Sequence, residues 1–104
     1  MRPNIIIQEP CGITDQSKQF FLDHKEEIGH VEAVSCFGVP VDGEYNVIIE
    51  GVKGQIRVDG FSWGYMGEGP RGLRWLLEET QCGTIHNRDI AFSSKASVLC
   101  FLAN

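Results

Sequence analysis

The order of apolar and polar residues divides the chain into short segments of strand and helix periodicity. Residues 4–9 (NIIIQE) place three consecutive isoleucines between two prolines, a pattern that predicts a short strand. Residues 30–41 (HVEAVSCFGVPV) predict a second strand, which ends at its proline. A further strand is expected over 84–92 (TIHNRDIAF). The apolar run at 94–103 (SKASVLCFLA) fits a buried strand or a short terminal helix, and we favour the strand.

The middle of the chain has the pattern of a β-hairpin. Residues 45–51 (YNVIIEG) and 55–65 (QIRVDGFSWGY) are separated by VKG, and the second arm alternates apolar with polar side chains. This alternation predicts one buried and one solvated face. Past Gly60 the alternation changes, so we expect either a bulge there or a strand end lined by aromatic side chains.

Two segments have apolar residues at the spacing of one face of an α-helix. The first runs from an expected N-cap at Thr14 or Asp15 to about Ile28, with Gly29 just past its end. The second covers 70–82 and begins with a proline, which suits the first helical position. Its core-facing stripe is expected to contain Leu73, Leu76, Leu77 and Thr80.

This order of elements predicts an α+β fold. We expect a single domain over residues 1–104, because this length is typical of one domain and buries a core without staples. The expected architecture is a mostly antiparallel sheet of four to six strands, with two helices packed on one face.

Composition and charge narrow the function classes. The net charge of −5 argues against bulk nucleic-acid binding and against a membrane surface, since both need clustered Lys and Arg. No signal peptide and no apolar stretch of membrane-spanning length is present, so we expect a cytoplasmic protein. The four cysteines are widely spaced, which favours reduced thiols over two disulfides in a secreted domain. The three histidines lack zinc-site spacing, and neither a metal nor another cofactor is expected.

The segment GFSWGYMGEGPRGLRW, residues 60–75, is the strongest candidate site. Its glycines let backbone N–H groups approach a ligand, and a helix N-terminus favours an anion. Two arginines near a helix start are disfavoured by the helix dipole, so a bound anion or nearby glutamates would compensate them. The alternative interpretation is a tight strand-to-helix turn with both tryptophans in the core. The candidate ligand-binding residues are Trp63, Tyr65, Gly67, Glu68, Gly69, Arg71, Arg74 and Trp75.

The same residues carry a resemblance to a known family. The stretch over about residues 55–78 is similar to the WGYxGxGPxxLA motif of a family of small domains found in bacteria, phages and prophages. Met66 and Arg74 depart from that motif, where a glycine and a small residue are usual. The resemblance implies a mobile-element or host–phage conflict setting, and it assigns no catalytic role to any residue. The matching positions are Trp63, Gly64, Tyr65, Gly67, Gly69, Pro70 and Leu73.

Two functional hypotheses follow from these features. The first is a non-enzymatic protein, for instance a phage-type sequestering protein, that binds an anionic, nucleotide-like small molecule, with Arg71 on the phosphate and Trp63 or Tyr65 on the base. A homo-oligomer fits this hypothesis, because a small chain makes only a shallow pocket alone. The second is an acidic protein that inhibits a host defence enzyme without a small ligand. A Cys–His enzyme is the weakest alternative, because no local signature supports it.

Overall fold

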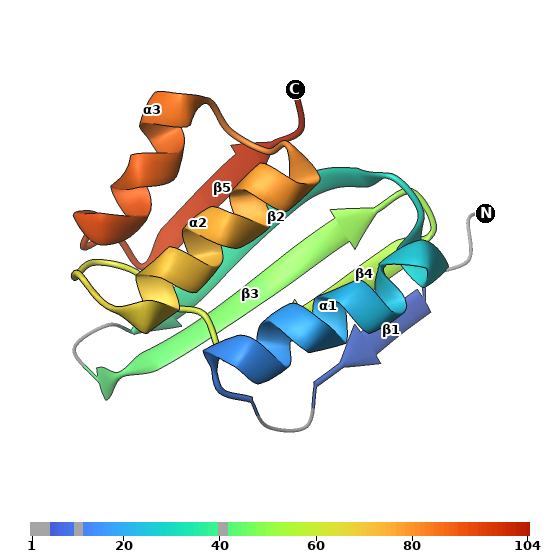
Figure 1. Cartoon of the computed structure of the whole chain (residues 1–104), viewed down its shortest axis with the longest axis horizontal. Coiled ribbons are helices and arrows are strands. Elements are labelled where there is room, and N and C mark those ends of the chain that lie inside the picture. Colours follow the sequence, from blue (N-terminus) through green and yellow to red (C-terminus); the bar gives the residue numbers. More distant parts are fainter. Residues whose placement is uncertain (1–4, 10–11, 40–41) are drawn as a thin grey trace.

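The computed structural model describes residues 5–9, 12–39 and 42–104, and it forms a sheet layer and a helix layer (Figure 1). The α+β prediction is confirmed. The elements are β1 (Ile5–Gln8), α1 (Thr14–Ile28), β2 (Val31–Val39), β3 (Glu44–Gly51), β4 (Gly54–Val58), α2 (Glu68–Thr80), α3 (Ile85–Arg88), a 3-10 helix (Asp89–Phe92) and β5 (Val98–Leu102).

The sheet has five strands in the order β1-β4-β3-β2-β5. β1 runs parallel to β4, and every other pair is antiparallel. The predicted hairpin is present as β3 and β4, and it occupies the middle of the sheet. Figure 1 shows α1 and α2 side by side on one face of this sheet, while the opposite face carries no helix within the described ranges.

The core lies between the sheet and these two helices. Alternate residues of the central strands point toward the helices and are buried, which explains the period of two along β3 and β4. The leucine stripe of α2 is fully buried, as its spacing predicted. Each such side chain contributes about 1.5–3 kcal/mol of hydrophobic free energy. The inward side chains include Phe21, Ile28, Val34, Val47, Ile49, Ile56, Leu73, Leu76, Leu77 and Phe101.

The strand predicted over 84–92 is wrong. Thr84 accepts a hydrogen bond from the backbone N–H of Asn87 at 3.1 Å, and this cap starts α3. Arg88 then donates from Nε to the carbonyl of Cys82 at 3.0 Å, and Asp89 pairs with Arg74 of α2 at 3.0 Å. These contacts stabilise a helical turn beside α2, and none of them is visible in the local apolar pattern.

Three predicted boundaries also differ. The second hairpin arm stops at Val58 rather than at residue 65, because the following segment leaves the sheet to reach α2. α2 begins at Glu68, two residues before Pro70. It ends at Thr80 rather than at residue 82, and its C-cap Gln81 lies in the left-handed region.

The start of α1 differs from its prediction as well. Its N-cap is Ile13, and Thr14 is already helical. The Thr14 hydroxyl donates to the carbonyl of Gly60 at 2.8 Å, so it ties α1 to the segment after β4 instead of capping its own helix. Gly29 ends α1 with a φ of 75°, as expected for a glycine past a helix end.

Candidate functional site

The segment between β4 and α2 is anchored by two buried aromatic side chains. Phe61 and Trp63 are 1% and 0% exposed. The Trp63 indole N–H donates to the carbonyl of Ala96 at 2.8 Å, and its ring meets Tyr45 edge-on with centroids 4.8 Å apart. Trp63 is therefore a core residue, and its faces are not available to stack on a ligand.

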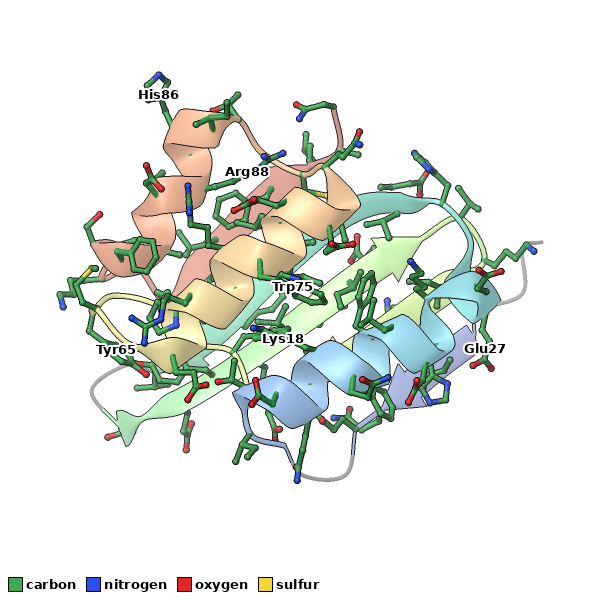
Figure 2. All side chains as sticks on the ribbon, viewed as in Figure 1. Lys18, Glu27, Tyr65, Trp75, His86 and Arg88 are labelled. Atoms are coloured by element: carbon green, nitrogen blue, oxygen red, sulfur yellow. The ribbon has the colours of Figure 1, made fainter. Side chains whose placement is uncertain are left out.

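Arg74 and Trp75 are held by contacts on the flanks of α2. The Arg74 guanidinium lies 3.0 Å from Asp89 and 3.6 Å from Glu78, which stands one helical turn later on α2. Trp75 meets Phe21 of α1 edge-on, and the Lys18 ammonium lies 5.5 Å from its ring centroid (Figure 2). The positive charge of Arg74 is thus balanced within the protein and does not need a bound anion.

Both long helices begin at the same pocket, which has a volume of about 410 Å³. The N-caps Ile13 of α1 and Gly67 of α2 provide no side-chain hydrogen bond to their helices. The first N–H groups of a helix lack partners within it and carry a partial positive charge. We call this hollow the helix-start pocket. Its lining residues are Gly12, Ile13, Thr14, Gly43, Tyr45, Asp59, Gly60, Phe61, Ser62, Tyr65, Glu68 and Gly69.

Hydroxyl groups and close backbone packing shape the pocket wall. The Ser62 and Tyr65 hydroxyls share a hydrogen bond of 2.7 Å, which orients the Tyr65 ring. Tyr65 is 46% exposed and stands at the end of the loop before α2 (Figure 2). Gly69 is needed beside this pair, since a Cβ there would overlap the Ser62 Oγ. The first turn of α2 therefore packs directly on the hydroxyl pair.

The pocket lining is acidic, and a basic side chain stands next to it on α2. Asp59 and Glu68 lie in the lining, which contains no Lys or Arg. Arg71 is exposed in the first turn of α2, one helical turn beyond Gly67, whose carbonyl accepts its backbone N–H at 3.1 Å. Within the described ranges, no carboxylate lies within ion-pair distance of Arg71. The pocket thus offers carboxylate acceptors inside, and an arginine without an ion-pair partner among the described residues stands in the adjoining first turn of α2.

The structure brings together only part of the predicted site. Tyr65, Glu68 and Gly69 line the pocket, Gly67 caps its second helix, and Arg71 is nearby. Trp63, Arg74 and Trp75 lie elsewhere. The residues that sequence reasoning missed come from the loop before α1, from the turn before β3 and from the end of β4. One feature pointed to the missed part of the pocket: the N-cap residue of α1 is Ile13, whose side chain cannot accept a hydrogen bond from the first turn of the helix.

The thiols of Cys36 and Cys82 are not activated for nucleophilic chemistry. Burial and, as the smaller cause, the nearby Cys100 raise the pKa of the Cys36 thiol from 9.0 to about 12. Burial also raises the pKa of Cys82, against smaller opposite effects of the Thr80 hydrogen bond and of Arg88. A catalytic cysteine needs a lowered pKa, so these two residues have the environment of structural cysteines.

The histidines and acidic residues form no metal site in the described parts of the chain, where no group of three potential ligands lies together. His24 pairs with Glu27 on the surface of α1, and His86 is exposed on α3 (Figure 2). No helix in the described ranges combines the length and apolar character needed to cross a membrane.

Comparison of the chain with protein-family models, with curated proteins and with solved structures finds no match.

Proposed function

We propose that this chain is a non-enzymatic binding protein that holds a nucleotide-like small molecule in the helix-start pocket. The main support for this proposal is that two helices begin at the helix-start pocket and that neither has a side-chain cap at its N-terminus. Their N–H groups are donors for the acceptor atoms of a ligand, and they favour negative charge.

Free thiols at Cys36, Cys82 and Cys100 support a reducing compartment, and we propose that the protein acts in the cytoplasm.

In this proposal, each part of the ligand has a partner in the pocket lining or next to it. The exposed Tyr65 ring offers a flat surface on which a base stacks. Asp59 and Glu68 accept hydrogen bonds from sugar hydroxyls, and Arg71 pairs with a phosphate at the rim. Because the two carboxylates repel additional negative charge, we expect a ligand with one phosphate to bind better than one with a polyphosphate chain.

Titration calorimetry with a panel of nucleosides, 5′-monophosphates, cyclic mononucleotides and triphosphates tests this function. We expect wild type to bind a monophosphate or cyclic mononucleotide. Arg71→Ala should weaken that binding by about tenfold or more, as expected for loss of a charge-assisted hydrogen bond. Arg57→Ala is the matched control, because Arg57 is an exposed arginine of β4 that bonds Gln55 outside the pocket. No binding to any member of the panel, or equal losses in the two variants, would contradict the proposal.

A second candidate function is inhibition of a basic protein partner. The exposed face of α1 favours it, since it carries four carboxylates and only two lysines, one of which lies over Trp75. Pull-down from a bacterial lysate at low and high salt tests it: the expected complex is lost at high salt. If this function is correct, the double variant Asp23→Lys/Glu27→Lys, whose changes lie on α1 and outside the pocket lining, should no longer capture the basic partner.

A further inference from the structure

A second pocket lies at the C-terminal ends of the two long helices. α1 and α2 run side by side in the same direction over the sheet, so the two helices that start at the helix-start pocket also end close together (Figure 1). Their last turns border a cavity of about 310 Å³, which we call the helix-end pocket. Its lining shares no residue with that of the helix-start pocket. It includes Phe21, Lys25, Glu26, Val31, Glu79 and Thr80.

The inner wall of the helix-end pocket is apolar. Phe21 of α1 is 3% exposed, and its ring meets Trp75 of α2 edge-on, with the centroids 6.2 Å apart. Val31, the first residue of β2, is half-buried and packs against the core. The Thr80 hydroxyl donates to the carbonyl of Leu76 at 2.8 Å, so its hydrogen is already used within α2. This wall therefore suits the apolar part of a ligand.

The rim of the helix-end pocket is negative. Glu26 and Glu79 are both exposed, and among the described residues no cationic side chain lies within ion-pair distance of either carboxylate. Lys25 is the single cation among the lining residues. The side chains of the lining therefore favour a positively charged ligand over a negatively charged one.

The two helix ends add negative charge at the same place. The last carbonyl groups of a helix lack partners within it and carry a partial negative charge that favours a cation. At the end of α2, the backbone N–H of Gly83 donates to the carbonyl of Leu102 at 2.9 Å. The Glu79 carbonyl therefore lacks the partner that another helical residue would provide. The helix dipoles thus give this pocket the opposite preference from that of the helix-start pocket.

We propose that the helix-end pocket binds a small organic amine that is protonated at neutral pH. Its ammonium group pairs with Glu26 and Glu79, and its apolar body contacts Phe21 and Val31. A metal ion fits less well, because no three potential metal ligands lie together in the described parts of the chain. The cavity of about 310 Å³ is at the lower end of the range of about 300–1,000 Å³ for ligand sites, so it suits a ligand with one ring.

An NMR titration with phenethylamine, followed through the backbone amide signals, tests this proposal. The amides of Phe21, Val31 and Thr80 should shift, with a dissociation constant on the order of 1 mM, as expected for a ligand of this size. Phenethyl alcohol keeps the ring but replaces the ammonium group with a hydroxyl, and it should bind at least about fivefold more weakly. Phenylacetate, which carries a negative charge, should not shift these amides.

Three charge variants locate the site. Glu79→Gln should weaken phenethylamine binding about two- to fivefold, as expected for loss of an exposed ion pair. Lys25→Gln removes the cation of the lining and should strengthen binding about twofold. Glu27→Gln is the matched control, because Glu27 is an exposed carboxylate of α1 that pairs with His24 outside the lining. It should bind like wild type.

The amide spectrum also reports whether each variant is folded. Equal affinities for phenethylamine and phenethyl alcohol would overturn the proposal, and so would a folded Glu79→Gln variant with unchanged affinity. Absence of shifts at the helix-end pocket would overturn it as well. The amides of Gly60 and Gly69 report the helix-start pocket, so failure of nucleotide binding and failure of amine binding are observed separately.

Discussion

Gly69 lets the first turn of α2 pack directly against Ser62, whose hydroxyl is bonded to Tyr65 at 2.7 Å. The sequence marked this glycine-rich stretch as a candidate site, but it did not show why position 69 must be glycine. The reason is Ser62, seven positions earlier, which leaves no room for a Cβ at position 69. We predict that Gly69→Ala lowers the free energy of unfolding by about 1–2 kcal/mol, because overpacking outweighs the gain of about 1 kcal/mol in helix propensity. Urea unfolding followed by tryptophan fluorescence measures this loss.

Ser62→Ala provides the control for this prediction. Removing the Oγ leaves the Ser62 Cβ as the nearest atom, 3.1 Å from the added methyl group. Gly69→Ala should therefore cost less in the Ser62→Ala background than in wild type. Equal costs in the two backgrounds would show that the contact does not determine the need for glycine.

At the scale of elements, α3 is the clearest case in which tertiary contacts overrode the local pattern. Ile85 and Ile90 suggested a strand, yet both are exposed, and the segment forms a capped helical turn beside α2. We predict that Thr84→Ala destabilises the protein by about 1 kcal/mol through loss of the cap, whereas Thr84→Ser, which keeps the acceptor oxygen, changes it little. Hydrogen exchange over 85–88 and the urea midpoint measure both effects. Similar results for the two variants would argue against capping as the cause.

The other elements were predictable where one periodicity extends over many residues. α1 was predicted with the correct C-terminal end and an N-terminal end one or two residues late, and the hairpin and the leucine stripe of α2 were predicted correctly. Their ends were less predictable, because a strand such as β4 ends where the chain must cross to the helix layer. The site was predictable only where its residues lie in one segment: Tyr65, Glu68 and Gly69 were found, and Asp59 and Thr14 were not.

At the scale of the whole molecule, burial of Cys36 links stability to pH. Its pKa is raised from 9.0 to about 12 by burial in the folded state. Below pH 9 the thiol is protonated in both states and contributes no pH dependence. Between pH 9 and 12 the unfolded thiol ionises while the folded thiol does not, so stability falls as pH rises. We predict an extra loss of up to about 2 kcal/mol near pH 10.5 in wild type.

Reductant-containing urea titrations at several pH values, on wild type and on Cys36→Ala, isolate this effect. The variant is less stable at neutral pH because it leaves a cavity, but its stability should decrease less steeply above pH 9. Parallel curves for the two proteins would exclude Cys36 as the source of the pH dependence.

The sequence by itself determined the class of the fold, because periods of two and of about 3.6 are local properties that a few residues display. It also determined that the glycine-rich segment joins a strand to a helix. Only the tertiary structure decided which aromatic side chains lie in the core, that both long helices start at one pocket, and that the outward side chains Val98, Cys100 and Leu102 of β5 are exposed. These properties depend on distances between residues far apart in the chain, and no local pattern encodes such distances.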